Sequence, residues 1–176
     1  MKSSVGSAVA ASAGAPQGWS LLPPAGTLQA AYLHAGHILV SRDPCRITTV
    51  LGSCVAVGIW DEATGVGGLN HFLLPHRLAT GAASPRFGNI AVPALIEGVI
   101  GAGGRRQSLQ AKVFGGACVL RAFREGGWHL GSKNVEVARR MLLEEGIPIA
   151  AEDVEGPRGR KLIFQTHDGA AWVRSL

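Results

Sequence analysis

The stretch ITTVLGSCVAVGIW, residues 47–60, decides the fold that we expect for this chain of 176 residues. It is apolar and rich in β-branched residues, and the pair Gly52-Ser53 interrupts it, so it predicts one strand on each side of a bend. The letters DEATG at 61–65 are typical of a turn, and residues 66–74 predict another strand that ends before a proline. The centre of the chain is therefore expected to be a β-hairpin preceded by a bent strand.

The rest of the chain adds shorter strands and two helices to this centre. Apolar residues at helical spacing indicate the helices, and Gly pairs or Gly-Pro stretches end them. The expected strands cover residues 33–40, 110–120, 147–151 and 161–165; the expected helices run from an Asn89 cap to Gly101 and from an Asn134 cap to Gly146. We therefore expect an α+β domain over residues 30–176, preceded by a flexible leader, 1–29, that is rich in Ala, Ser, Gly and Pro.

Composition limits the class of protein. The formal net charge is +5, but the basic residues are scattered and no aromatic-interleaved basic stripe accompanies them, so charge alone does not indicate nucleic-acid binding. The three cysteines form no CxxC pair, which favours free thiols in a reducing compartment, the cytoplasm. No run reaches the roughly 18 apolar residues of a membrane-spanning helix, and residues 5–15 lack the large aliphatic side chains of an export signal.

Counting residues around the hairpin brings a cysteine and a histidine together. If residues 61–64 form a four-residue loop, Trp60 faces Gly65 and Cys54 faces His71. Side chains directly opposed on antiparallel strands have Cβ atoms about 5 Å apart, which lets a thiol reach an imidazole. A shift of the register by one residue would place His71 on the opposite face.

A cysteine beside a histidine is a candidate nucleophile, because the imidazole can take the thiol proton. The backbone N–H groups at Gly52 and Ser53 could bind an oxyanion. Thr48 could orient the His71 ring if the chain turns at Gly52. Two alternatives stay open on pattern alone: Cys54 as a small buried apolar residue, with His71 in a structural role, and a metal site made with His76, although that set lacks a recognised ligand spacing.

Several longer motifs resemble the CheD family, the chemoreceptor glutamine deamidases of bacterial and archaeal chemotaxis. The resemblance runs in order from about residue 30 to 170. The motifs are LHAG at 33–36, TTVLGSCVAV at 48–57, GGLNHFLLP at 67–75, RFG at 86–88, KVFGGA at 112–117, GSKN at 131–134 and GRKLIF at 159–164.

The resemblance implies a fold and a set of site residues. The family fold is a single-domain α/β sandwich with mixed β-sheets flanked by helices, similar to the catalytic domains of deamidating toxins. By position, Cys54 is the nucleophile, His71 the base and Thr48 the residue that orients the histidine. Expected oxyanion or positioning residues are Gly52, Ser53 and Asn70, and candidates for substrate binding are Phe87, Gly115 and Gly116.

The resemblance also implies a reaction and partners. The Cys54 thiolate attacks a glutamine carboxamide of a methyl-accepting chemotaxis receptor, in its cytoplasmic helical region, and water hydrolyses the resulting thioester. No cofactor and no metal are expected. A receptor methylesterase side activity and a CheC-type phosphatase partner are both expected. Lys133 and Glu155 depart from the family pattern. The alternatives are a binding module that regulates a receptor or phosphatase without catalysis, and nucleic-acid binding.

Overall fold

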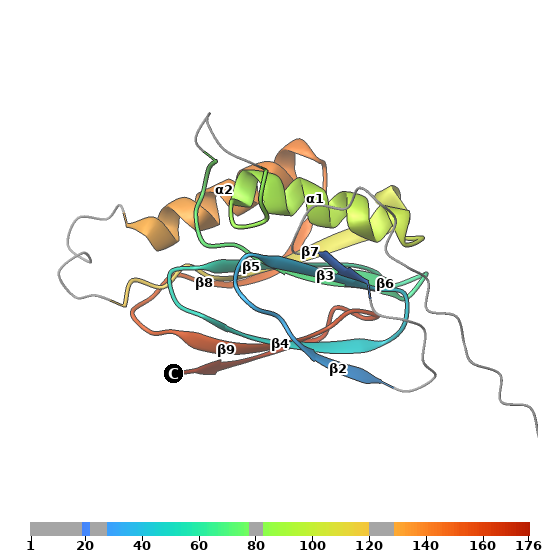
Figure 1. Ribbon diagram of the computed structural model, residues 1–176, viewed down its shortest axis with the longest axis horizontal. Helices are drawn as coiled ribbons and strands as arrows, with labels where there is room; N and C mark the ends of the chain where they lie inside the picture. The colour runs from blue at the N-terminus through green and yellow to red at the C-terminus, as the bar shows by residue number, and fades with distance from the viewer. Residues whose placement is uncertain (1–18, 22–27, 78–82, 120–128) are drawn as a thin grey trace, which may run out of the picture.

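The computed structural model describes residues 19–21, 28–77, 83–119 and 129–176, which form three layers (Figure 1). Two helices cover one face of a six-stranded sheet, and a four-stranded sheet packs against its other face. The helices are α1 (Gly88–Gly101) and α2 (Leu130–Glu144), and a short 3-10 helix, η1 (Arg106–Ser108), precedes β7.

Both sheets are mixed. The six-stranded sheet has the order β1-β3-β6-β5-β7-β8 and the four-stranded sheet the order β10-β9-β4-β2. The strands of the larger sheet are β1 (Trp19–Leu21), β3 (His37–Ser41), β5 (Val55–Asp61), β6 (Val66–His71), β7 (Leu109–Gly115) and β8 (Ile149–Val154). Those of the smaller sheet are β2 (Gln29–Tyr32), β4 (Cys45–Leu51), β9 (Arg160–Gln165) and β10 (Ala171–Ser175).

Each interface between layers has its own apolar core. Val57, Leu95 and Leu142 belong to the cluster between the helices and the larger sheet. Ile47, Leu69 and Phe164 belong to the cluster between the two sheets. The expected α+β class with mixed sheets is thus confirmed, and both helices lie on the same face of the larger sheet.

Three elements differ from the sequence prediction at the ends of the chain and in its first strand. β1 lies inside the range predicted as a leader and pairs in parallel with β3; most of the remaining leader lies outside the described residues. Only the second half of the strand expected over 33–40 forms: β2 ends at Tyr32, and β3 begins at His37 after a turn in which Gly36 has a φ of 81°. The terminal strand β10 was not predicted from the sequence.

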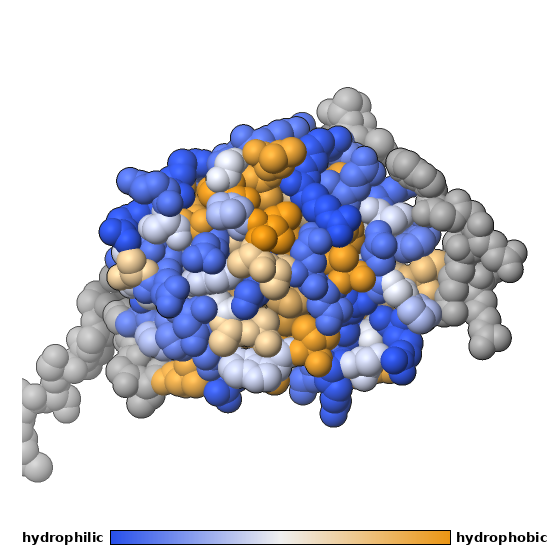
Figure 2. All heavy atoms as spheres, turned by 180° about the vertical axis from the view of Figure 1, so that it is seen from behind, coloured by the Kyte–Doolittle hydropathy of each residue, from blue (hydrophilic) through white to orange (hydrophobic). Residues whose placement is uncertain are grey.

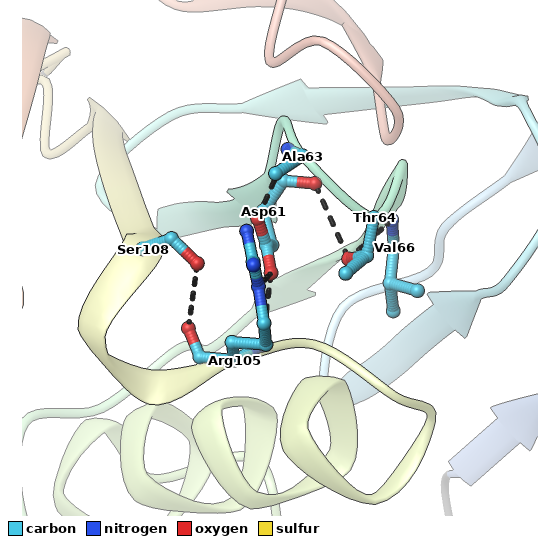
Figure 3. Close-up of polar contacts among 6 residues, drawn as sticks. All are labelled: Asp61, Ala63, Thr64, Val66, Arg105 and Ser108. Carbon is cyan, nitrogen blue, oxygen red and sulfur yellow. Dashed lines mark hydrogen bonds and ion pairs between the residues drawn. The ribbon is translucent and has the colours of Figure 1, made fainter.

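The β5–β6 hairpin forms with a register two residues away from the prediction. Trp60 pairs with Gly67, and Asp61 extends the strand by pairing with Val66. The Asp61 carboxylate accepts hydrogen bonds from the backbone N–H groups of Ala63 and Arg105 and from the Arg105 side chain (Figure 3). These contacts hold Asp61 in the strand, so the loop begins one residue later than expected.

Both helices begin before their predicted asparagine caps. His129 is the N-cap of α2 and forms a reciprocal capping box with Ser132, whereas Asn134 lies within the helix. α1 starts after Phe87, which makes no side-chain cap. Asn89 instead accepts a hydrogen bond from the backbone of Arg77.

The surface is mixed in character. The face seen in Figure 2 is mostly hydrophilic, with a band of hydrophobic residues that runs from the helix layer across the level of the sheets. Apolar side chains at a surface are normal for folded proteins. Among the described residues, no helix is both long and apolar enough to cross a bilayer.

Candidate functional site

Cys54 lies where the chain crosses from one sheet to the other. β4 ends at Leu51 in the smaller sheet and β5 begins at Val55 in the larger one, so residues 52–54 form the crossing. The Cys54 side chain is half-buried and packs against the core between the sheets. The bend expected at Gly52-Ser53 is thus where the structure places it.

His71 ends β6 on the same side of the larger sheet as Cys54. Val55 pairs with Phe72 through two backbone hydrogen bonds of 3.1 and 2.9 Å, so Cys54 and His71 are diagonal rather than direct neighbours. Diagonal neighbours on an antiparallel pair are about 7–8 Å apart, still within reach of long side chains. The two-residue difference in register changes the predicted spacing and preserves the predicted face, because side chains alternate with a period of two.

A buried threonine fixes the protonation of the His71 ring. The Thr49 hydroxyl donates a hydrogen bond of 2.8 Å to the Leu33 carbonyl and lies 2.9 Å from His71 Nδ1. A hydroxyl has one hydrogen, and the carbonyl can only accept. Nδ1 must therefore carry the proton and donate to Thr49, which leaves a lone pair on Nε2 of the neutral ring.

The free nitrogen of this ring is available for chemistry. His71 is only 4% exposed, and its Nε2 atom is buried without a hydrogen-bonding partner among the described residues. Buried polar atoms are nearly always paired, and exceptions cluster at functional sites. The ring therefore presents an unprotonated acceptor on the face that carries Cys54.

The environment keeps both groups neutral near pH 7. Burial lowers the pKa of His71 to about 4; the Leu33 carbonyl acts in the opposite direction, and the nearby His34 and His37 lower it further. Burial also raises the pKa of the Cys54 thiol, with a smaller opposing effect of its own backbone N–H. The resting pair is a thiol and an imidazole rather than an ion pair.

Thr48 does not reach His71, which corrects the expectation from the sequence. Strand β4 alternates, so Ile47, Thr49 and Leu51 are buried. Thr48 points to the other face, where it pairs with Tyr32 and Ile163 on the neighbouring strands. The residue that contacts the imidazole is Thr49.

Asn70 is likewise not at the site. Its Oδ1 accepts a hydrogen bond of 2.8 Å from the Val57 N–H, and its Nδ2 donates one of 3.1 Å to the Ala91 carbonyl in α1. As the neighbour of His71 in a strand, it faces the helix layer on the opposite side of the sheet. Its amide ties the sheet to α1 and is not directed toward Cys54.

The sequence predicted oxyanion donors at Gly52 and Ser53, and the donors that the crossing segment presents are instead those of Ser53 and Cys54. The carbonyls of Gly52 and Cys54 each accept a hydrogen bond of 2.8 Å, from Ala117 N–H and Gly116 N–H. Among the described residues, no backbone carbonyl accepts a hydrogen bond from the N–H groups of Ser53 and Cys54. These two groups are candidate donors for an oxyanion.

The glycines expected to bind substrate lie directly behind this segment. A side chain at Gly115 would stand 2.2 Å from the Cys54 carbonyl oxygen, and Gly116 has a φ of 71° with Gly131 of α2 packed against it. They therefore pack against the backbone of Cys54 and of Gly131. Phe87 is half-buried immediately before α1 and forms a parallel β-bridge with Leu74.

Sequence reasoning missed the role of one further side chain. Asn134 is fully buried, and its Nδ2 donates hydrogen bonds of 2.9 Å to the carbonyls of Ser53 and of Leu73. The sequence signal was present in the GSKN motif, where the residue was interpreted as a helix cap. Within the described ranges, no group of three or more His, Cys, Asp and Glu side chains is arranged to hold a metal ion.

A thiol, a base of fixed tautomer and two N–H groups without a backbone acceptor form a candidate site for nucleophilic attack on a carbonyl, in an α+β sandwich. Comparisons with known proteins identify the family. A family model described as "CheD chemotactic sensory transduction" matches residues 73–175. The chain belongs to the CheD family.

Two curated relatives cover most of the chain. "Probable chemoreceptor glutamine deamidase CheD 1" of Anaeromyxobacter dehalogenans is 58% identical over 82% of this chain and 84% of its own length. "Probable chemoreceptor glutamine deamidase CheD" of Sulfurimonas denitrificans is 40% identical over 81% of this chain and 92% of its own length. Among solved structures, the hypothetical protein YfiH of Bacillus licheniformis aligns with a TM-score of 0.44 and 16% identity, over 66% of this chain and 49% of that chain.

Proposed function

We propose that this protein deamidates glutamine side chains of chemoreceptors, with Cys54 as nucleophile and His71 as general base. The observation that carries the proposal is the Thr49–His71 hydrogen bond, because it leaves the unprotonated Nε2 on the face of Cys54. Relatives that are 58% and 40% identical carry names for this activity. The proposed substrate places the reaction in the cytoplasm.

The first step forms the carbon–sulfur bond. As the Cys54 sulfur attacks the carboxamide carbon of the glutamine, His71 Nε2 takes the thiol proton, so the reactive thiolate is generated during the attack. The carboxamide oxygen gains the negative charge. The N–H groups of Ser53 and Cys54 stabilise that charge, which is the function of an oxyanion hole.

The second step breaks the carbon–nitrogen bond. The proton on His71 Nε2 passes to the leaving nitrogen, ammonia departs, and a thioester to Cys54 remains. Water then attacks the thioester carbon while Nε2 takes a proton from the water. Collapse of this second adduct releases glutamate, and the proton returns from His71 to the Cys54 sulfur. The sum is glutamine plus water giving glutamate plus ammonia.

Trapping the acyl intermediate tests this mechanism. Incubation of the protein with a receptor cytoplasmic fragment should release ammonia, and added hydroxylamine should divert the thioester to a glutamyl hydroxamate. Cys54→Ala should give neither product. His71→Ala should retain the thermal transition of the wild type and lose both products. Ammonia release without hydroxamate, at any hydroxylamine concentration, would argue against a thioester.

Two further expectations remain predictions. Methyl esters of receptor glutamates present the same carbonyl to Cys54 with methanol as the leaving group, and methanol release from a methylated receptor fragment tests this side activity. Binding to a CheC-type phosphatase is tested by co-elution of the two purified proteins.

A further inference from the structure

Asn134 connects the two segments that carry the reacting side chains. Ser53 directly precedes Cys54, and Leu73 lies two residues after His71; the Asn134 Nδ2 group donates 2.9 Å hydrogen bonds to both carbonyls. The orientation of this amide is determined by its partners, because two carbonyls can only accept and Nδ2 has two hydrogens. The carboxamide therefore uses both donors to fix the spacing of the two segments.

The bond to Ser53 also orients the nucleophile's own N–H. In a planar trans peptide the C=O of one residue and the N–H of the next point in opposite directions. Anchoring the Ser53 carbonyl toward α2 therefore directs the Cys54 N–H away from α2, where no backbone carbonyl of a described residue accepts it. In the same way, the bond from Ala117 N–H to the Gly52 carbonyl directs the Ser53 N–H.

We propose that Asn134 is a positioning residue of the active site: it presets the Ser53–Cys54 peptide as an oxyanion donor and holds the Cys54 crossing against the His71 strand. This inference rests on the proposed function for its reaction and extends it to a residue that touches neither substrate nor reacting atoms. A rigid donor of this kind requires no reorganisation during the reaction.

The packing of α2 does not depend on Asn134 alone. α2 is already anchored by its buried apolar side chains, among them Val135, Ala138 and Leu142, and by the close contact of Gly131 with Gly116. Asn134 Oδ1 is buried without a partner among the described residues. An unsatisfied buried acceptor costs about 1–3 kcal/mol, and the carboxamide is retained here with its two donors directed to the carbonyls of Ser53 and Leu73.

The test compares reactions that need the oxyanion donor with one that does not. Asn134→Leu removes the donor and keeps a side chain of similar size. We expect kcat for ammonia release to fall about 100-fold, the loss typical of removing one oxyanion donor, with KM changed less than about threefold. Alkylation of Cys54 by iodoacetamide passes through no oxyanion, and its rate should stay within about threefold of the wild type.

A third readout separates this inference from the proposed substrate. The hemithioacetal that acetaldehyde forms with Cys54 places an oxygen at the same donors, and carbon-13 NMR of labelled acetaldehyde measures its stability without any receptor. Asn134→Leu should weaken it at least tenfold. If the wild type releases no ammonia from receptors while this dependence holds, the substrate proposal fails and the positioning role stands.

Two outcomes overturn the positioning role. One is a hemithioacetal of unchanged stability; the other is an equal loss in alkylation, hemithioacetal formation and turnover, which would indicate general disruption. Asp61→Asn serves as a stability control, because it removes charge contacts at the far end of β5 from Cys54 and should leave turnover unchanged. If Asn134→Leu shows no cooperative thermal transition, Asn134→Asp, which places a carboxylate against the two carbonyls, is measured in the same three assays.

Discussion

Replacing Thr49 with valine tests how the site fixes its base. Val keeps the branched shape and removes only the hydroxyl that donates to Leu33 and accepts from His71 Nδ1. Without that acceptor, the neutral ring loses its preference for the Nδ1–H tautomer, and the proton also occupies Nε2, in the tautomer that cannot take the Cys54 proton. The matched control is Thr48→Val, one residue earlier on the opposite face of β4.

The expected loss follows from the hydrogen bonds removed. A buried donor or acceptor left unpaired costs about 1–3 kcal/mol. If the substitution disfavours the reactive Nδ1–H tautomer by about 1.4–2 kcal/mol, the rate decreases roughly 10–30-fold. This is less than the roughly 10⁴-fold loss when a charged orienting carboxylate is neutralised in a serine protease, because Thr49 is neutral.

The assay is steady-state ammonia release from a receptor fragment, with thermal melts to confirm folding. We expect kcat/KM of Thr49→Val to fall roughly 10–30-fold, and that of Thr48→Val to stay within about twofold, as for surface substitutions. Equal losses in the two variants, or a loss confined to Thr48→Val, would refute the assignment of the tautomer to Thr49.

Four further outcomes are expected. Because burial lowers the pKa of His71 to about 4, the base stays neutral under mild acid, and kcat/KM should lose activity only as pH falls toward about 4; an acid limb near pH 6.5 would contradict this. The raised pKa of Cys54 predicts that its iodoacetamide alkylation rate keeps rising beyond pH 9, and a plateau near neutral pH would show a preformed ion pair. Burial raises the pKa of Asp61, but hydrogen bonds, chiefly from Arg105, outweigh burial and lower this pKa from 3.8 to about 2. The ionised carboxylate therefore stabilises the fold above its unfolded pKa, and this contribution is lost as pH falls toward 2. Denaturant melts of Asp61→Asn should lack this part of the acid dependence of stability, and a profile equal to that of the wild type would contradict it. Gly116→Ala should lower both thermal stability and turnover, since a Cβ there meets Val135 Cγ2 at 2.5 Å with a φ of 71°; wild-type values for both would show that the turn behind Cys54 adapts.

The hairpin shows what residue counting can predict. The alternation of strand side chains placed Cys54 and His71 on one face correctly, because a two-residue error in register preserves the face. The register itself depends on Asp61, whose strand position is fixed by Arg105, 44 residues away in the chain. Local turn chemistry does not contain that contact.

The alternation of residues along β4 could have identified which threonine lies beside His71. Arg46 and Thr48 are two residues apart and therefore share a face, and an exposed arginine at position 46 indicates the solvent side. The same alternation gives Thr49 the buried face with Ile47 and Leu51. The family resemblance assigned the orienting role to Thr48 by position, whereas the alternation of the strand places Thr49 beside His71.

The contacts of Asn134 could not be predicted from the sequence. Asparagine before an apolar helical stripe is typical of an N-cap, but His129 and Ser132 form the cap one turn earlier. The contacts of Asn134 with Ser53 and Leu73 span 81 and 61 residues of chain. Such contacts are set by the packing of α2 on the larger sheet and have no periodic signature.

The central claim is that Cys54 converts receptor glutamines to glutamates, and peptide mass mapping of a receptor cytoplasmic fragment tests it most directly. The fragment is digested and mapped after incubation with wild-type protein, with Cys54→Ala, and with neither. The account predicts glutamine-to-glutamate conversion at specific positions with the wild type alone. Conversion of the same glutamines at the wild-type rate by Cys54→Ala, or no conversion by the wild type, would contradict it.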